Sequence, residues 1–490
     1  MRYPLPNSRL ALLIALALGA VSVAGYAPFY LYPIPIVALA WLFHYWNKCS
    51  TAKQAAWLGY AFGLGLFGAG IPWIYISLHD FGGMPLPMAA FSTLALCAFL
   101  SLSAAGAGWI SKQTAAPLIA VPMLWVLFEW IRNWIFTGFP WLILGYSQVP
   151  YSPLAGVAPV FGVYGVSLVT AFTASLLALL AEKTMRRRVL LALITLWIAG
   201  SLLKLIEWTK PVGVPFSVAL LQGNIAQDMK WQPEVAQRTL DSYLQLARQS
   251  SAQLTVLPET ALPMLIKEVP AEYLNQLKTL AQQNHGDLLV GSVELENGRY
   301  YNSMLSFGSA LTQTYRKSHL VPFGEFIPLK GIFGWIYRDW LNIPLTDLSH
   351  GSPDQKPLKI AGQQVAVNIC YEDVFGEEII RQLPQATLLV NASNDAWYGE
   401  SLAADQHLQI SQTRTLETGR MMLRATNTGA TAIIDHHGNV LAHAPHFTTT
   451  MLNGRAQGYA GTTPYIRYGN WPVIIFCVLA VTLLWGRKKK

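Results

Sequence analysis

Long apolar runs fill the first two hundred residues of the chain. Each is close to the roughly 20 residues that a helix needs to cross the hydrocarbon core of a bilayer. Seven such runs lie at about 9–25, 27–46, 54–78, 85–111, 116–136, 158–182 and 189–207. An eighth, at 471–485, precedes the basic tail RKKK. The pattern predicts about eight transmembrane helices, seven before and one after a long polar segment.

The lysines and arginines between these runs predict an orientation, because basic residues collect on the cytoplasmic side. With a cytoplasmic N-terminus, the inside segments hold Arg2, Arg9, Lys48, Lys53, Lys112, Lys183, Arg186, Arg187, Arg188 and the RKKK tail. The outside loops 79–84 and 137–157 then hold no lysine or arginine. We therefore expect a multi-pass membrane protein with both termini in the cytoplasm and residues 211–465 outside it, which in a bacterium means the periplasmic face of the inner membrane.

Residues 211–465 have a different sequence pattern, in which short β-rich runs alternate with polar helical ones. This alternation is typical of an α/β domain. Strands are predicted at 218–225, 254–260, 287–294, 300–308, 365–373, 386–395 and 431–440, and helices at 232–250, 271–284, 375–383 and 403–422. The predicted organisation is a membrane domain (1–210), an α/β domain (211–465) and a final transmembrane helix with its tail (466–490).

Composition narrows the class of protein further. The chain has 490 residues, of which 53% are hydrophobic and 12% are charged, about half the charged share of soluble domains. The net charge of +8 arises largely from the juxtamembrane basic residues. We see no basic stripe interleaved with aromatics and expect no nucleic-acid partner. The four cysteines show neither a disulfide framework nor the ligand spacing of a zinc site.

Three predicted strands lead into ionisable residues: Glu259 in VLPET, Lys317 in TYRKSHL and Cys370 in NICYED. Ligand sites of α/β folds collect at the C-terminal ends of strands, so these side chains could converge. A carboxylate can take the proton of a thiol, and an ammonium group can stabilise the thiolate and a later oxyanion. Each residue also has a plain structural interpretation: a buried apolar cysteine, a helix cap and a solvated lysine.

Five motifs occur in order over about 180 residues: LLQGNIAQDMKW, LPETALP, YRKSHLVPFGEFIP, NICYEDVFG and NASNDAWYG. Together they resemble the carbon–nitrogen hydrolase (nitrilase) superfamily. Placed between seven apolar runs and one more, they resemble in particular the apolipoprotein N-acyltransferases of Gram-negative bacteria. The resemblance implies an αββα sandwich joined to a polytopic helical membrane domain.

The resemblance also implies a role for each motif residue. Glu259 would be the general base, Lys317 the stabiliser of the oxyanion and Cys370 the nucleophile. Glu325 would orient Lys317, and Glu372 would support the cysteine loop. Three aromatic residues would surround the substrate: Trp231, Tyr371 and Trp397. We expect no metal and no other cofactor.

The implied reaction is an acyl transfer between two membrane-anchored partners. An acyl chain from the sn-1 position of a phospholipid such as phosphatidylethanolamine would pass through a thioester on Cys370 to the α-amine of a diacylglyceryl apolipoprotein. Two alternatives stay open. A membrane-anchored amidase or nitrilase would use water as the acceptor, and a non-catalytic scaffold would retain only the fold.

Other segments allow more than one interpretation. Residues 328–345, rich in Trp, Tyr and Ile, are either a buried amphipathic helix or an arm that dips into the outer leaflet. Glu129 and Arg132 could form a local ion pair or a functional site in a membrane helix. Asn394 and Asp395 could satisfy turn backbone groups. The histidines of the C-terminal part are better explained by a hairpin turn at DHHGN than by a metal site: His436, His437, His443 and His446.

Overall fold

The computed structural model describes residues 8–227, 233–327, 331 and 347–486. Its contacts divide the chain into two compact units. The helical unit comprises residues up to Tyr75, Pro87–Glu207 and the chain from Arg467 onward. The α/β unit comprises Ile76–Leu86 and Trp208–Ile466. The segment Ile76–Leu86 thus lies between two helices of the helical unit in sequence, but belongs to the α/β unit by its contacts.

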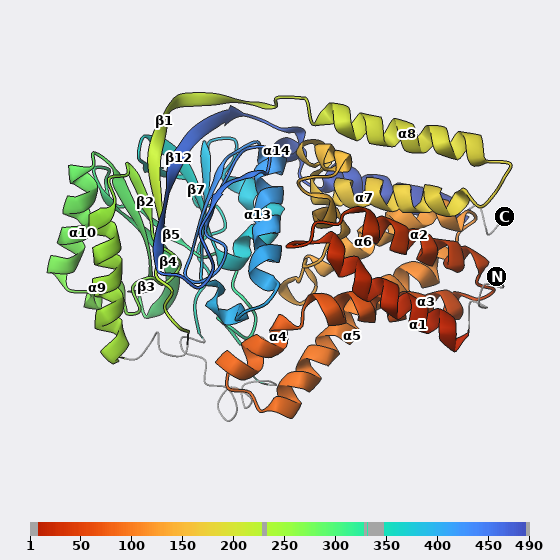
Figure 1. Ribbon diagram of the computed structural model, residues 1–490, viewed down its shortest axis with the longest axis horizontal. Helices are drawn as coiled ribbons and strands as arrows, with labels where there is room; N and C mark the ends of the chain where they lie inside the picture. The colour runs from red at the N-terminus through yellow and green to blue at the C-terminus, as the bar shows by residue number, and fades with distance from the viewer. Residues whose placement is uncertain (1–7, 228–232, 328–330, 332–346, 487–490) are drawn as a thin grey trace. The chain divides into compact units, whose positions relative to one another are not determined.

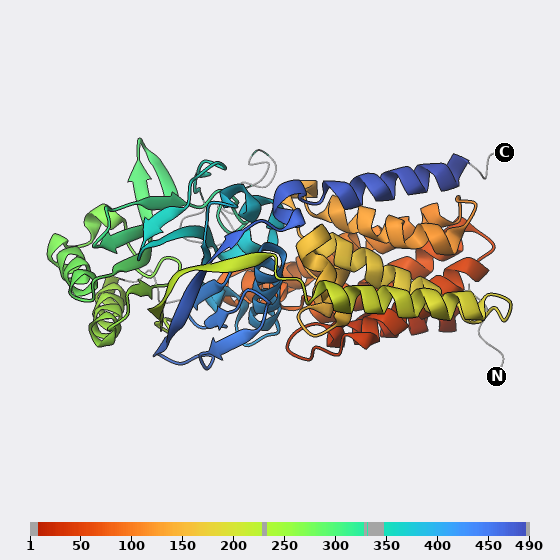
Figure 2. The same cartoon turned by 90° about the horizontal axis from the view of Figure 1, so that it is seen from above.

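The helical unit is a bundle whose long helices run roughly along one direction (Figures 1 and 2). Its helices are α1 (Arg9–Val21), α2 (Pro33–Lys48), α3 (Ala52–Gly70), α5 (Leu86–Ser111), α6 (Pro117–Arg132), α7 (Ala158–Leu179), α8 (Arg186–Leu203) and α15 (Trp471–Gly486), and the short α4 (Trp73–Ile76) follows α3. Glycines let α1 and α3 approach closely, because a Cβ on Gly19 or Gly65 would meet the backbone of the facing helix.

Length and composition do not support all eight predicted spans. Among the described residues, two helical stretches are long and apolar enough to cross a bilayer, Leu86–Ser111 and Pro153–Leu179. A third results if Ala52–Gly70 and Trp73–Phe81, which are bent by 53°, count as one span. The other predicted spans are not confirmed by this test, and several of their helices are short. Helices α2 and α6, for example, have only 16 residues, about 24 Å of helix.

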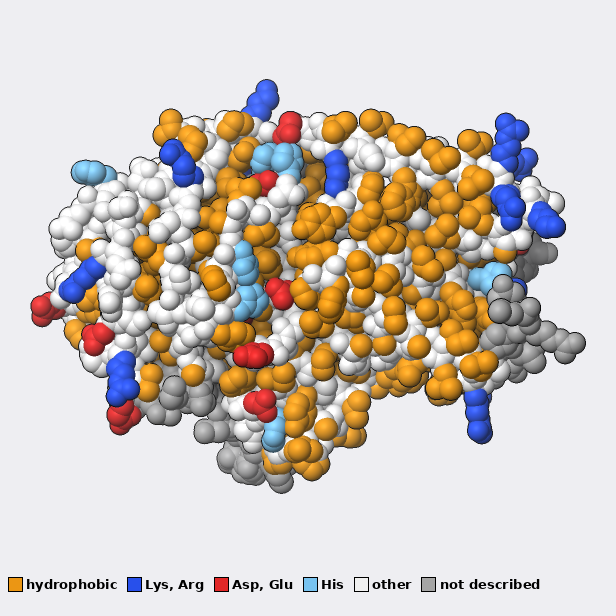
Figure 3. All heavy atoms as spheres, in the orientation of Figure 1, with side chains coloured by type: hydrophobic (Ala, Val, Ile, Leu, Met, Phe, Trp, Pro, Cys, Tyr) orange, Lys and Arg blue, Asp and Glu red, His pale blue; other side chains and the backbone are white. Residues whose placement is uncertain are grey.

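The outer surface of the helical unit is nevertheless apolar. In Figure 3 hydrophobic side chains cover its visible face and basic side chains gather at one end. The exposed residues include Leu13, Val37, Phe91, Leu94, Leu102, Ile194, Ile198, Leu479 and Leu483. An exposed apolar surface of this extent fits a lipid environment.

Two six-stranded sheets form the centre of the α/β unit. The first has the order β12-β1-β2-β3-β4-β5 and the second the order β11-β10-β9-β8-β7-β6. The first sheet contains β1 (Thr209–Gln222), β2 (Leu254–Val256), β3 (Asp287–Glu296), β4 (Arg299–Gly308), β5 (Thr314–Arg316) and β12 (Thr450–Gly461). The second contains β6 (Leu358–Ile360), β7 (Gln363–Ile369), β8 (Leu388–Ser393), β9 (Met422–Thr426), β10 (Ala432–Ile434) and β11 (Val440–His443).

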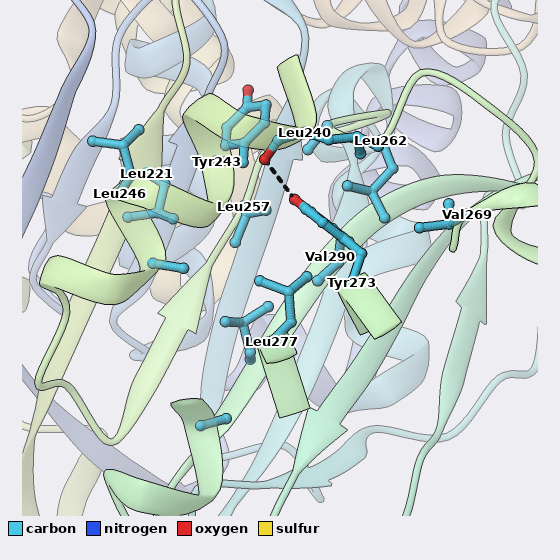
Figure 4. Close-up of a cluster of buried hydrophobic side chains, with 14 residues drawn as sticks. Leu221, Leu240, Tyr243, Leu246, Leu257, Leu262, Val269, Tyr273, Leu277 and Val290 are labelled. Carbon is cyan, nitrogen blue, oxygen red and sulfur yellow. Dashed lines mark hydrogen bonds between the residues drawn. The ribbon is translucent and has the colours of Figure 1, made fainter. Parts of the chain in front are cut away.

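Helices cover the outer faces of both sheets, so the unit has helix, sheet, sheet and helix layers (Figure 1). Helices α9 (Pro233–Gln249) and α10 (Ala271–Gln283) pack on the first sheet. Figure 4 shows their core, in which the Tyr273 hydroxyl donates to the Leu240 carbonyl at 3.0 Å. Helix α13 (Ala403–Thr418) packs on the second sheet, and α12 (Gly376–Ile379) and α14 (Pro464–Tyr468) are short. The predicted α/β class is confirmed.

The sequence was less reliable where one element gives way to another. The predicted helix 403–422 ends at Thr418, because Gly419 adopts a left-handed conformation (φ 61°) and stops it. The residues from Met422 onward then form β9, which was not predicted. The hairpin at DHHGN is confirmed: β10 and β11 pair antiparallel, and the Asp435 carboxylate accepts from the His437 and Asn439 amides.

Candidate active site

The Glu259 carboxylate lies beyond the C-terminal end of β2, where it has partners from both sheets. Its Oε1 accepts from Asn302 Nδ2 at 2.7 Å and from Lys317 Nζ at 3.3 Å. Its Oε2 accepts from the Asn394 backbone amide at 2.9 Å. These three donors hold the carboxylate in one position.

Lys317 directly follows β5 and is almost completely buried, with 1% of its surface exposed. Its ammonium group lies 3.3 Å from Glu259 and 2.9 Å from Glu325. Burial alone would lower the pKa of Lys317, but these two carboxylates outweigh that effect and raise the pKa. The side chain therefore supplies a fixed positive charge to the site at any physiological pH.

Cys370 is the first residue after β7 and begins the short turn Cys370–Val374. Its backbone has a positive φ of 53°, which is unusual for a residue with a side chain. Burial raises the pKa of the Cys370 thiol, the charge of Glu259 raises it further, and Lys317 opposes them. The charges of Glu259 and Lys317 both act on the thiol, so Cys370 belongs to the same buried cluster. The structure thus brings the three predicted side chains together.

A raised thiol pKa predicts how Cys370 should respond to pH. In the resting protein we expect slow alkylation by iodoacetamide at pH 7.5, because only the thiolate reacts. The rate should climb about tenfold per pH unit and still be rising at pH 9. Intact-protein mass spectrometry would follow the reaction, with Cys370→Ala as the blank. An alkylation rate that levels off below pH 8 would contradict a raised pKa of the Cys370 thiol.

Glu372 joins the cysteine turn to the segment that carries the lysine. Its Oε1 accepts from the Ser318 amide at 2.6 Å, the Ser318 hydroxyl at 2.9 Å and the His319 amide at 3.1 Å. Its Oε2 accepts from the Ile369 amide at 2.7 Å and the Tyr315 hydroxyl at 3.0 Å. Burial raises the pKa of Glu372, although these donors oppose the rise. The carboxylate is therefore placed to hold the two segments in register.

Glu325 is the second carboxylate that pairs with Lys317. Its Oε1 accepts from Lys317 and, at 3.0 Å, from Asn302 Nδ2, and its Oε2 accepts from the Val321 amide at 2.8 Å. This placement agrees with an orienting role.

Asn302, on β4, is a site residue that the sequence reasoning missed. Its side-chain amide nitrogen donates to Glu259 and to Glu325, and its backbone carbonyl accepts from the Lys317 backbone amide at 2.8 Å. Asn302 therefore binds the same two carboxylate oxygens as the lysine. The available signal is only a polar residue in the strand run YYNSM, which is too common to identify a site.

The position of Asn302 leads to a graded prediction for acyl transfer. Asn302→Leu should slow the reaction roughly 10- to 100-fold, because hydrogen bonds to charged groups contribute about 1.5–3 kcal/mol. Asn302→Asp should be slower still, because it adds a third carboxylate to the cluster. Acyl transfer to a diacylglyceryl peptide would be measured, with Ser306→Ala on the same strand as a buried polar control. Equal activity of the Asn302→Leu and Asn302→Asp variants would contradict a role of Asn302 as hydrogen-bond donor to the two carboxylates.

The predicted aromatic residues have different surroundings. Tyr371 is buried in the cysteine turn, where its ring meets Phe375 edge-on at 5.3 Å. Trp397 lies in the turn Asp395–Tyr398, and its carbonyl accepts from the Ser77 hydroxyl at 2.6 Å. Its ring lies 6.4 Å from that of Phe81, also in the Ile76–Leu86 segment. Trp231 and nearly all of 328–345 lie outside the described residues.

Asn394 and Asp395 do more than satisfy their own turn. Besides the Asn394 amide that donates to Glu259, the Asn394 side chain donates to Gln227 at 2.6 Å. Asp395 pairs with the buried Arg424 at 3.0 Å. The sequence reasoning did not identify Arg424, because its strand β9 was not predicted.

Glu129 and Arg132 have mainly local partners within the helical unit. Glu129 accepts from the Trp125 indole at 3.0 Å and from the Leu144 amide at 2.7 Å. Arg132 donates to the Trp141 carbonyl at 3.0 Å. Both residues thus fix the segment around 141–144 to α6, which favours the structural interpretation.

Comparison with known proteins agrees with this geometry. The family described as apolipoprotein N-acyltransferase N-terminal domain matches residues 18–176, and the carbon–nitrogen hydrolase family matches residues 217–465. A protein of Nitrosomonas europaea named apolipoprotein N-acyltransferase is 54% identical over 98% of this chain and 97% of its own. Proteins with the same name from Chromobacterium violaceum and Methylococcus capsulatus are 45% and 42% identical, over 99% and 98% of this chain and 96% and 97% of theirs. The chain therefore belongs to the apolipoprotein N-acyltransferase family of the carbon–nitrogen hydrolase superfamily.

Proposed function

We propose that this protein transfers an acyl chain from the sn-1 position of a phospholipid, with phosphatidylethanolamine as the expected donor, to the N-terminal α-amine of a diacylglyceryl apolipoprotein. The observation that carries the proposal is the buried cluster in which Lys317 pairs with Glu259 and interacts with Cys370. Membership of the family supports the choice of donor and acceptor.

In the first half of the proposed reaction, Glu259 takes the proton of the Cys370 thiol. The thiolate attacks the carbonyl carbon of the ester, and Lys317 stabilises the oxyanion of the tetrahedral intermediate. The carbon–oxygen bond to glycerol then breaks, and the leaving oxygen takes the proton from Glu259. The products are a lysophospholipid and a thioester on Cys370.

In the second half, the neutral α-amine of the apolipoprotein attacks the thioester carbonyl. Glu259 takes the proton that the attacking nitrogen releases, and Lys317 again faces the oxyanion. The carbon–sulfur bond breaks, Cys370 leaves as a thiolate and recovers the proton from Glu259, and an amide remains. Two covalent steps of this kind give ping-pong kinetics.

A reconstituted reaction separates the proposed transfer from hydrolysis. Purified protein would be incubated with phosphatidylethanolamine alone and then with a diacylglyceryl peptide. Intact mass should show one added acyl chain on the protein, which moves to the peptide amine in the second stage. Free fatty acid as the main product in the presence of peptide would instead identify a hydrolase.

We further propose that the protein spans the bacterial inner membrane eight times, with the α/β unit in the periplasm. The apolar surface of the helical unit supports this topology (Figure 3). Within that unit, α1 begins and α15 ends at the same end as the connection from α7 to α8, which contains Lys183 and leads into Arg186–Leu203 (Figures 1 and 2). A shared basic end is typical of the cytoplasmic side.

Labelling of introduced cysteines can test this orientation. Leu311→Cys lies in an exposed loop of the α/β unit, and Glu182→Cys lies in the exposed α7–α8 connection. A membrane-impermeant maleimide should label position 311 in spheroplasts and position 182 only after permeabilisation. The reverse pattern would overturn the proposed topology.

A further inference from the structure

Four charged side chains without a role in the proposed chemistry lie in the interior of the α/β unit. Arg424 comes from β9 and His407 from α13, while Asp373 and Asp395 come from the two turns after β7 and β8. Each is at most 2% exposed. Burial of so many charged groups is costly, and apolar replacements of buried ion pairs are often as stable. Their role is therefore better sought in geometry than in stability.

Arg424 and His407 each bridge the same two turns. Arg424 lies 3.3 Å from Asp373 Oδ2 and 3.0 Å from Asp395 Oδ2, through different guanidinium nitrogens. His407 Nε2 lies 2.7 Å from Asp373 Oδ1, and its Nδ1 lies 3.4 Å from Asp395 Oδ1. Because two rigid planar groups span the same pair of carboxylates, the separation of the two turns is fixed twice over.

Two serines complete the coordination of the carboxylates. The Ser411 hydroxyl donates to Asp373 Oδ2 at 2.5 Å, and the Ser393 hydroxyl donates to Asp395 Oδ1 at 2.6 Å. Burial alone would raise the pKa of Asp395, but Arg424 and His407 outweigh it and keep the pKa well below the ordinary value. Each carboxylate therefore accepts from a serine hydroxyl as well as from Arg424.

Each bridged turn carries part of the candidate active site. Asp373 lies three residues after Cys370, in the same turn Cys370–Val374. Asp395 directly follows Asn394, whose backbone amide donates to Glu259 Oε2 at 2.9 Å. A displacement of one turn against the other would therefore change the distance between the thiol and the carboxylate.

We propose that Arg424 and His407 are positioning residues that set the spacing between Cys370 and Glu259 by clamping their two turns together through Asp373 and Asp395. The inference deepens the proposed function and rests on it, because it takes Cys370 as the nucleophile and Glu259 as the base. Neither clamp residue is expected to contact substrate.

The test compares two conservative arginine variants. Arg424→Lys keeps the positive charge but cannot reach both carboxylates with a planar fork. Arg420→Lys is a matched control, because Arg420 is equally buried but donates to the backbone carbonyls of Ala386 and Gly461 instead. The measurements are the single-turnover rate of thioester formation with phosphatidylethanolamine, by intact mass, and the thermal midpoint by circular dichroism.

The rates are compared at a temperature well below the thermal midpoint of either variant. We expect Arg424→Lys to form the thioester at least tenfold more slowly than the wild type. The rate of thioester formation in Arg420→Lys should stay within twofold of the wild-type rate, even if its thermal midpoint falls as far as that of Arg424→Lys. The proposed clamp would be overturned if the rate of thioester formation fell only in proportion to the loss of thermal stability in both variants. An unchanged rate in Arg424→Lys would overturn it as well. If Arg424→Lys does not fold, His407→Gln gives the same comparison through the second bridge. Absence of a thioester in the wild type would instead overturn the proposed function.

A double-mutant cycle distinguishes one clamp from two separate supports. Asp373→Asn and Asp395→Asn should each slow thioester formation, and the double variant should be little slower than either alone, because residues that act as a unit are strongly non-additive. Independent, multiplying effects would contradict a shared clamp.

Discussion

Cys370→Ala should lose acyl transfer completely while the α/β unit keeps its fold. In the proposed mechanism the sulfur forms the covalent bond to the acyl chain, and the methyl group of alanine cannot form that bond. Loss of a nucleophile costs roughly 10⁶-fold in comparable enzymes. Incubation with a phospholipid that carries a labelled sn-1 chain should load the wild type through a hydroxylamine-sensitive bond and leave the variant unlabelled.

The other cysteines supply the control for this experiment. Cys49, Cys97 and Cys477 are buried and are not disulfide-bonded. Cys97→Ala, in the middle of α5, should accept and transfer the label as the wild type does. Hydroxylamine-sensitive label that persists in Cys370→Ala would remove Cys370 from the nucleophile role and make another side chain the acyl carrier.

The three proposed catalytic side chains could be located from the sequence because their positions follow from simple strand patterns. Glu259 and Cys370 lie near the ends of the predicted strands 254–260 and 365–373, and Lys317 lies just beyond a strand-like run. In the structure they follow β2, β7 and β5. What the runs could not show is that β2 and β5 belong to one sheet and β7 to the other. Convergence across two sheets depends on how they pack, which is a tertiary property.

Asn302 shows why positioning residues are harder to find. It reaches the lysine only because β4 and β5 pair antiparallel, with Ser303 opposite Arg316. A shift of one residue in this register would turn the Asn302 side chain to the other face of the sheet. Strand register is not encoded in the local pattern of a strand such as RYYNSMLSFG, so the contact could not be predicted.

The membrane helices show a different limit of the sequence pattern, which concerns their length. Apolar runs merge helices with the buried turns that join them, because both are hydrophobic in sequence. The run at 27–46 begins with turns, and α2 starts only at Pro33, since proline favours the first helical turn. Run length therefore exceeds helix length, and hydrophobicity alone does not count spans.

Replacement of Lys317 should have the second-largest effect on acyl transfer. Lys317→Met keeps much of the side-chain volume but removes the only cation whose ion pairs with Glu259 and Glu325 are seen among the described residues. Loss of an oxyanion donor costs about 2.7–4 kcal/mol of barrier, or roughly 10²- to 10³-fold in rate. Loss of one partner of a buried pair also costs about 3–5 kcal/mol of folding stability.

A compensated variant separates these two effects. In Lys317→Met combined with Glu325→Gln, one negative charge is removed with the positive one, so the cluster keeps its charge balance. The free energy of unfolding, measured with urea, should recover most of its loss, while thioester formation should remain at least 100-fold slow. The free energy of unfolding should recover while the rate does not. Folding requires only balanced charge, whereas the reaction requires a donor that faces the developing oxyanion. If the compensated variant regained near-wild-type turnover, Lys317 would be a structural counter-ion and the oxyanion would need another donor.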